Sequence, residues 1–191
     1  MTKARKYSIL LLIQAIPGNR KERENMKSVF LFPNEKKDTE LLYTKRAMEY
    51  LKARGCRVYS IAELPGAESV NGEPPADLQF AVILGGDGTI LRALDYAIPG
   101  DLPILGVNIG RLGFLCEVER DDVEEDLCRV LDGGYAVDER MTMCIEGFDE
   151  QRFFALNEVV IDRSTPEVRI LSLEYAANGT TVNHISGDGL I

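Results

Sequence analysis

Five consecutive residues, Gly85-Gly86-Asp87-Gly88-Thr89, combine backbone freedom with a carboxylate in a way that suits phosphate chemistry. They follow the apolar run at residues 80–84 and precede a stretch with helical spacing. Glycine lets another molecule approach the backbone closely, and the first turn of a helix offers free N–H groups and a positive dipole end to an anion. A carboxylate there repels phosphate unless it binds a metal ion or accepts a proton from a nucleophile. The pattern therefore indicates phosphoryl transfer.

This turn differs from the two common nucleotide-binding loops. A Walker A loop requires G-x-x-x-x-G-K-[ST], which is absent, and a G-x-G-x-x-G loop would need a third glycine where Leu91 stands. Arg92 lies about one helical turn further on and is a candidate contact for the same anion, although it could equally be a solvated helix residue. The plain alternative is a tight strand-to-helix turn that happens to contain an aspartate.

The elements around this turn alternate between strands and helices. Strands are predicted at residues 29–32, 56–61, 80–84 and 103–107, and helices at 40–53, 89–97 and 121–132. Asp38 or Thr39 is the expected cap of the first helix, and Gly55 suits the position after its end. The unbroken apolar run at 80–84 is typical of a strand buried on both faces of a parallel sheet. We therefore expect an α/β domain at residues 26–134.

The pattern changes at about Tyr135. Residues 141–146, 152–161, 168–175 and 180–185 are strand-like and are separated by turn signals, among them Asn178-Gly179, a strong hairpin signal. Residues 135–191 are therefore predicted to form an all-β domain. Because the chain stops as another apolar strand begins, we expect this domain to be incomplete and the chain to be a fragment.

Charge separates the first 25 residues from the rest. The chain has a formal net charge of −9, but residues 1–25 carry six Lys or Arg and two Glu, a net +4. Residues 1–25 are predicted to be a tail, a docking strand or the product of a mis-called start codon, and to be dispensable, with the domain starting near Met26. The acidic balance argues against nucleic-acid binding. No apolar run reaches the length of about 18 residues that a membrane span needs, so no membrane partner is expected.

Cysteine spacing indicates free thiols. Cys56, Cys116, Cys128 and Cys144 contain no C-x-x-C pair, and His184, the one histidine, cannot complete a zinc set of the usual spacing. No metal-ligating residue is therefore assigned. Free thiols fit a reducing compartment, which predicts a cytoplasmic protein.

Three further segments accompany the glycine turn. They are N-I-G-R-L-G-F-L at residues 108–115, A-L-N-E-V-V at 155–160 and G-D-G-L-I at 187–191. The glycine turn by itself resembles NAD kinases, the diacylglycerol and sphingosine lipid kinases, and the phosphofructokinases. The four motifs, in this order and spacing, resemble the NAD kinase family.

The resemblance implies a two-domain NAD-kinase-like architecture and phosphorylation of the adenosine 2′-hydroxyl of NAD. ATP or polyphosphate would be the donor, with Mg²⁺ or another divalent cation at its phosphates, and the full-length protein would be a homodimer or homotetramer that acts on small nucleotides. Asp87 matches the family's catalytic base. The implied binding residues are Gly85, Gly86, Gly88, Thr89 and Arg92 toward phosphate, Phe114 beside the adenine, Asn157 and Glu158 at the base and ribose hydroxyls, Asp188 at the nucleotide site, often across a subunit interface, and Arg169 as a basic contact.

The chain also departs from the family. The segment S-T-P-T-G-S-T-A-Y should follow Ile191 and is absent, and Ser164-Thr165-Pro166 does not replace it because Glu167 follows. We therefore expect the 191-residue chain to be inactive and poorly soluble by itself. A lipid kinase and a non-catalytic nucleotide-binding module are the alternatives that the sequence leaves open, and the sequence does not distinguish ATP from polyphosphate.

Overall fold

The computed structural model describes residues 4–15, 28–70, 75–110, 113–146, 151–163 and 170–191, with the backbone alone for residues 4–15. The chain divides into two compact units, Met1–Leu156 and Asn157–Ile191. We call them unit 1 and unit 2 and describe each by itself. No helix within the described ranges has the length and apolar character that crossing a membrane would require.

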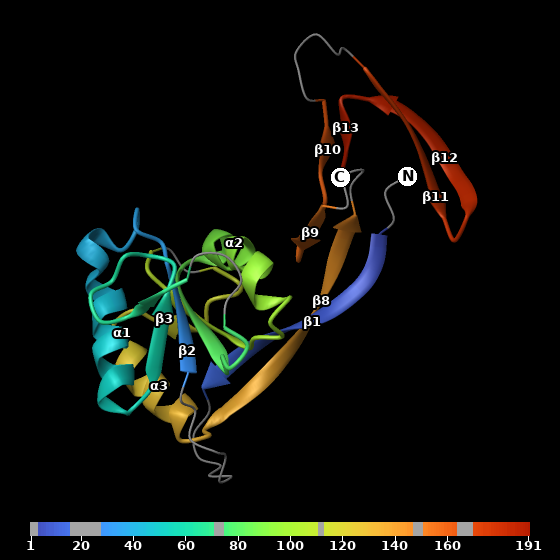
Figure 1. Ribbon diagram of the computed structural model, residues 1–191. Helices are drawn as coiled ribbons and strands as arrows, with labels where there is room; N and C mark the ends of the chain where they lie inside the picture. The colour runs from blue at the N-terminus through green and yellow to red at the C-terminus, as the bar shows by residue number, and fades with distance from the viewer. Residues whose placement is uncertain (1–3, 16–27, 71–74, 111–112, 147–150, 164–169) are drawn as a thin grey trace. The chain divides into compact units, whose positions relative to one another are not determined.

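Unit 1 is built on one large sheet (Figure 1). Within the described residues, its strands are β1 (Ala4–Ala15), β2 (Ser28–Pro33), β3 (Arg57–Ser60), β4 (Glu68–Ser69), β5 (Phe80–Gly85), β6 (Ile104–Asn108), β7 (Val118–Glu119), β8 (Tyr135–Glu146) and β9 (Arg152–Ala155). Their order is β4-β3-β2-β5-β6-β1-β8-β9, with β7 also paired to β6. The pairs from β4 to β1 are parallel, and those of β8 with β1 and β9 are antiparallel. The predicted α/β fold with a parallel sheet is confirmed.

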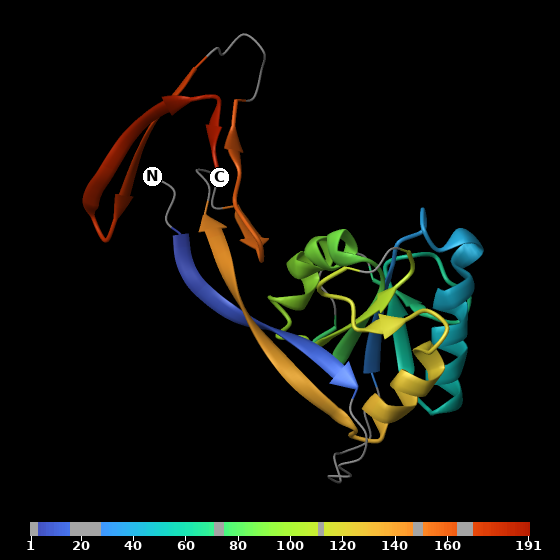
Figure 2. The ribbon, with the colours of Figure 1, turned by 180° about the vertical axis from the view of Figure 1, so that it is seen from behind.

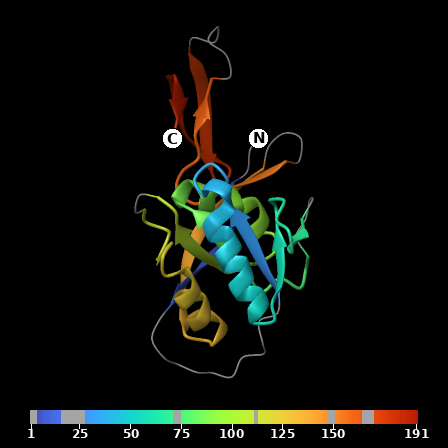
Figure 3. The ribbon, with the colours of Figure 1, turned by 90° about the vertical axis from the view of Figure 1, so that its left-hand side faces the viewer.

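Helices cover both faces of this sheet. A short 3₁₀ turn, η1 (Thr39–Leu41), leads into α1 (Leu42–Ala53), and α1 lies beside α3 (Val123–Leu131) on one face (Figure 3). The helix α2 (Asp87–Ala97) packs on the other face. Alternate strand residues therefore serve two cores. Val29 and Leu31 pack under α1 and α3, whereas Phe30 and Phe32 pack under α2. This explains why the central strands are apolar without a break.

Asp38 binds the start of α1 as a capping side chain would, although α1 begins at Leu42, two residues later than predicted, with Leu41 at its N-cap position. Its side chain is buried, and its carboxylate accepts hydrogen bonds from the N–H groups of Tyr43 (3.0 Å) and Thr44 (2.9 Å) and from the Thr44 hydroxyl. These bonds satisfy amide hydrogens that have no partner inside the first turn of a helix. The loop between β2 and α1 is thereby tied to the helix that it precedes.

The structure of the N-terminal segment differs from the prediction that the domain starts near Met26. Residues 4–15 form β1, which lies between β6 and β8 and pairs with β8 from Ala4↔Ile145 to Ala15↔Tyr135 (Figure 2). Of the three alternatives, the structure has the docking strand, and the expected boundary at Met26 is not a boundary of the fold. The expected boundary at Tyr135 also moves, because β8 and β9 belong to the same sheet and unit 1 ends at Leu156. Local pattern and charge did not indicate a partner strand about 130 residues away.

Unit 2 consists of short antiparallel strands. They are β10 (Ile161–Asp162) paired with β13 (Gly189–Leu190), and β11 (Leu171–Ala177) paired with β12 (Thr180–Gly187). Asn178 and Gly179 have φ values of 51° and 83°, as a tight hairpin turn requires, so the predicted hairpin is confirmed. The strand predicted at residues 152–161 is interrupted, because β9 ends at Ala155 and β10 begins at Ile161. None of the described residues of unit 2 is buried.

Candidate functional site

The glycine turn lies at the point where the strand order of unit 1 reverses. From β2 the chain adds β3 and β4 on one side, and it then returns to place β5 and β6 on the other. In open parallel sheets, ligands bind beyond the carboxyl ends of the strands at such a reversal. Here these ends are Pro33 of β2 and Gly85 of β5, and the register that pairs the two strands ends at Pro33↔Leu84. The topology therefore brings the β2–α1 loop and the glycine turn to one binding position.

The turn itself is closely packed on its inner side and open on its outer side. A β-carbon on Gly85 would lie 2.5 Å from Cβ of Thr89 and 2.8 Å from its Cγ2, whereas one on Gly88 would meet nothing within 4 Å. Thr89 is buried, and its hydroxyl accepts hydrogen bonds from the Asn34 side-chain amide (3.0 Å) and the Gly86 N–H (3.4 Å). Gly85 and Thr89 therefore shape the turn from inside. Gly88 is exposed, and it lies in the first turn of α2, where backbone N–H groups can bind an anion.

Asp87 is the first residue of α2, and the segment at residues 113–115 holds its carboxylate. One oxygen accepts the N–H of Phe114 (2.8 Å) and the other accepts the N–H of Leu115 (3.1 Å). Gly113 permits this contact, since a β-carbon there would lie 2.5 Å from the Asp87 carboxyl carbon. Each carboxylate oxygen keeps a further lone pair. The carboxylate is thus fixed in orientation and still able to accept a proton.

Phe114 and Arg92 are two further residues that the sequence analysis predicted to bind the substrates. The Phe114 side chain is 93% exposed, so it is not a core residue and is available to a planar ligand. The Arg92 guanidinium lies over the Phe32 ring, 5.7 Å from its centroid, at the carboxyl end of β2. It is therefore close to the reversal point, but no contact joins it to Asp87 among the described residues.

Sequence reasoning missed three contributors to this site. Asn34 and Lys37 lie in the β2–α1 loop, and Gly113 lies in the segment that holds Asp87. The Lys37 Nζ is 3.2 Å from the position of a Gly86 β-carbon and 3.7 Å from that of a Gly110 β-carbon. Asn34 and Lys37 could have been identified by the rule that ligands bind where the strand order of a parallel sheet reverses. That rule indicates the loop after β2, but only once the strand order is known.

Cys116 lies near Asp87 and Lys37, but its thiol is unreactive. Burial is the main cause that raises the pKa of its thiol to about 12. The negative charge of Asp87 raises this pKa further, whereas the positive charge of the Lys37 ammonium lowers it. The thiol stays protonated at physiological pH. The opposing effects also show that Asp87 and Lys37 act on one small region.

Unit 2 carries the remaining predicted residues. Asn157 and Glu158 are exposed and lie in the irregular segment between β9 and β10. Asp188 is exposed, with its carboxylate 3.6 Å from the Arg163 guanidinium. Arg169 lies outside the described residues.

No set of three or more His, Cys, Asp or Glu side chains that could hold a metal ion occurs in the part of the chain that the structure describes. The donor groups of these residues do not fit a metal site built by the protein alone. Proteins often bind Mg²⁺ through one or two carboxylates together with substrate phosphates and water.

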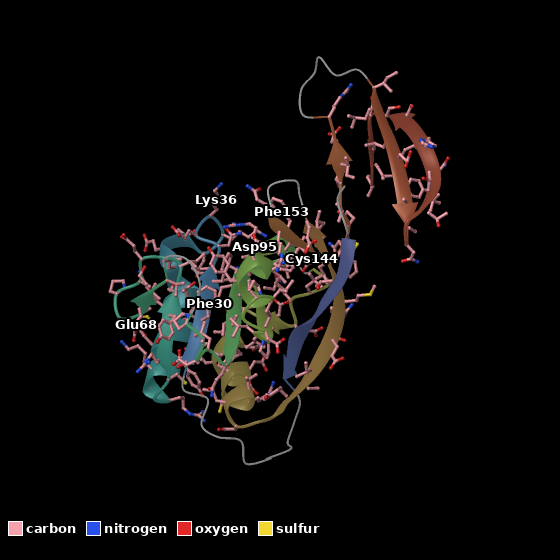
Figure 4. The ribbon with its side chains drawn as sticks, turned by 45° about the vertical axis from the view of Figure 1, so that its right-hand side comes forward. Phe30, Lys36, Glu68, Asp95, Cys144 and Phe153 are labelled. Atoms are coloured by element: carbon pink, nitrogen blue, oxygen red, sulfur yellow. The ribbon has the colours of Figure 1, made fainter. Side chains whose placement is uncertain are left out.

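A cavity of about 630 Å³ lies at the other end of α2, away from the glycine turn. Figure 4 labels Asp95, Cys144 and Phe153 around it. It is lined by Asp95, Ile98, Pro99, Cys144, Arg152, Phe153 and Phe154. None of these residues belongs to the glycine turn or to the segment that holds Asp87.

Comparisons with known proteins agree on one family. The family model described as the ATP-NAD kinase N-terminal domain matches residues 29–135. The chain is 36% identical over 174 residues to the NAD kinase of Lachnoclostridium phytofermentans and 37% identical over 176 residues to that of Natranaerobius thermophilus; each match covers 87% of this chain and 61% of the relative. The NAD kinase of Heliobacterium modesticaldum is 35% identical over 175 residues, covering 87% of this chain and 62% of the relative. The chain thus spans about three fifths of the length of these curated relatives.

Proposed function

This chain belongs to the NAD kinase family, and from that premise we propose that the protein carrying it phosphorylates the adenosine 2′-hydroxyl of NAD to form NADP. The observation that carries the proposal is the position of Asp87. Its carboxylate is fixed by two backbone N–H groups beside an open glycine turn, at the reversal point of the sheet. A base and a phosphate-binding turn are the two parts that transfer of a phosphoryl group to a hydroxyl requires.

In the proposed step Asp87 accepts the proton of the 2′-hydroxyl while the hydroxyl oxygen bonds to the terminal phosphorus of the donor. The phosphoric anhydride bond of the donor breaks, and the shortened phosphate leaves with the electron pair of that bond. The free N–H groups at the start of α2 stabilise charge on the transferred phosphoryl group. The donor is ATP or polyphosphate. A divalent cation bound to the donor phosphates would neutralise part of their charge, and the described side chains form no separate site for one.

We assign the adenosine side of the substrate to residues outside the glycine turn. Exposed Phe114 offers its ring to the adenine, and Asn157 and Glu158 offer hydrogen-bonding groups to the base and ribose. Asp188 and Arg169 complete the proposed nucleotide contacts. The charge of −9 and the free thiols support a cytoplasmic enzyme of small nucleotides that does not bind nucleic acid or membranes. We further propose a homodimer or homotetramer, in which Asp188 serves a neighbouring subunit's site.

The test is NADP formation by the purified protein, with NAD and either ATP or polyphosphate. The wild-type protein should form NADP with at least one donor, and Asp87→Asn should lower kcat by about 10²–10⁴-fold, the usual contribution of a general base. Asn is not a neutral replacement here, since its amide group must face one of the two N–H donors that the carboxylate accepts. NAD binding and melting temperature are therefore measured on the same samples. A protein that makes no NADP with either donor, or an Asp87→Asn variant with normal kcat, would contradict the proposal.

A further inference from the structure

Lys37 places a positive charge over the glycine-lined side of the site. Its Nζ lies 3.2 Å from the β-carbon position of Gly86 and 3.7 Å from that of Gly110. These residues end or follow two neighbouring strands, β5 and β6, which pair up to Gly85↔Asn108. Because both residues lack a β-carbon, the ammonium can lie close to their backbone, and Lys37 is the one side chain of the described residues within 4 Å of either β-carbon position. Gly86 is also the N-cap residue of α2, so the ammonium lies close to the start of that helix.

The loop does not need this ammonium for its own conformation. Backbone bonds account for its course, since the N–H groups of Lys37 (2.9 Å) and Asp38 (2.8 Å) both donate to the Asn34 carbonyl. The Asn34 N–H donates to the Leu84 carbonyl at 2.8 Å, which ties the loop to β5. The Lys37 side chain is exposed, and within the described ranges no carboxylate lies within ion-pair distance of it. A structural ion pair therefore does not explain its position.

The positive charge of Lys37 offsets the repulsion between the Asp87 carboxylate and a phosphate group. A carboxylate at the start of α2 repels the phosphates that the turn and helix attract. The ammonium acts on the same region with the opposite sign, as their opposing effects on the Cys116 thiol show. Lysine is a compact charge on a flexible stem, which suits contact with a phosphate oxygen.

We propose that Lys37 binds the phosphates of the phosphoryl donor, holding them between the β2–α1 loop and the glycine turn. The inference rests on the proposed function and adds to it the residue that recognises the donor. The shared chemistry is a phosphoric anhydride chain, which ATP and inorganic polyphosphate both provide. Lys37 acts on the donor and not on NAD, so its loss should change one substrate's kinetics and leave the other's unchanged.

The experiment compares Lys37→Met with Lys36→Met in the complete protein. Lys36 is the matched control, because it has the same side chain in the same loop and projects away from the fold (Figure 4). Binding of inorganic tripolyphosphate is measured by calorimetry, and the KM values for ATP, polyphosphate and NAD are measured by steady-state kinetics. Loss of a charge-assisted hydrogen bond predicts a roughly 10- to 100-fold weaker tripolyphosphate affinity and a similar rise in the donor's KM for Lys37→Met. The KM for NAD and the melting temperature should match those of Lys36→Met, and Lys37→Arg should recover part of the affinity.

The binding and kinetic arms separate the two claims. Unchanged tripolyphosphate affinity in Lys37→Met, or an equal loss in Lys36→Met, would overturn the assignment of Lys37 whatever the activity. A rise confined to the KM for NAD would overturn it as well. A wild-type protein that binds tripolyphosphate through Lys37 and makes no NADP would support the assignment while refuting the proposed function. The kinetic arms also show whether ATP or polyphosphate is the donor that Lys37 contacts.

Discussion

Replacing Gly85 by alanine should destabilise unit 1, although the backbone at Gly85 is open to any residue. Its φ does not lie in the left-handed region, so the cost is steric alone. The new β-carbon would lie 2.5 Å from Cβ of Thr89 and 2.8 Å from its Cγ2, and closer still to Oγ1. Thr89 cannot move away cheaply, because it is buried, stiff at χ1 and hydrogen-bonded to Asn34 and Gly86. The first turn of α2 must therefore shift away from β5.

The expected size follows from these contacts. Overpacking of a well-packed site costs about 1–3 kcal/mol, and weakening the two Thr89 hydrogen bonds costs about 1 kcal/mol each. The lower entropy of the unfolded alanine chain offsets about 0.4–1 kcal/mol. We expect a net loss of about 2–5 kcal/mol, which corresponds to a fall in melting temperature of about 4–20 °C for a chain of this size.

Gly88→Ala is the matched control. Gly88 lies three residues further on in the same turn and is exposed, and a β-carbon there meets nothing within 4 Å. Its melting temperature should stay within about 1 °C of the wild-type value or rise by a few degrees, since alanine is the better helix former by about 1 kcal/mol.

The assay is thermal unfolding followed by circular dichroism at 222 nm. All α-helices of the described residues lie in unit 1, so this signal reports the unit that contains the turn. Gly85→Ala with a wild-type melting temperature would refute the reasoning, because it would mean that the turn relaxes without cost. An equal loss in Gly88→Ala would show that any side chain in the turn is destabilising and that Thr89 is not the cause.

Three further predictions follow from particular contacts. A chain that starts at Met26 lacks β1 and leaves β8 without its long partner, so its melting temperature should fall by several degrees; an unchanged value would restore the view that residues 1–25 are dispensable. At pH 8 a thiol reagent should label Cys128 rapidly and the other three cysteines slowly. Cys128 is half-buried while the other three are buried, and burial raises the pKa of Cys56 and Cys116. Rapid labelling that persists in Cys128→Ser would contradict this. Phe114→Ala should raise the KM for NAD about 10-fold without changing the melting temperature, since the exposed ring contributes stacking to a ligand but nothing to the core; a large stability loss would show that the ring packs against the protein.

Local pattern was sufficient for most elements of unit 1. The run at residues 80–84 predicted a strand buried on both faces, and it is β5, with alternate residues under different helices. The Asn178-Gly179 hairpin and the Asp38 cap followed from turn and capping chemistry in the same way. Each of these features depends on neighbours a few residues away, which is why periodicity and residue type reveal them. The glycine turn with Asp87 belongs to the same class, because it lies between a strand and a helix that the sequence defines.

Tertiary structure decided what depends on distant partners. Residues 4–15 are basic and apolar in sequence, and their role as β1 became clear only from pairing with β8. Asp87 is held by the N–H groups of Phe114 and Leu115, and Lys37 reaches Gly86 from the loop after β2. These contacts join residues 27 to 141 positions apart in the sequence, and the strand order of the sheet brings those segments together. A one-dimensional pattern carries the side-chain types of such a site, whereas strand order and register determine which of them meet.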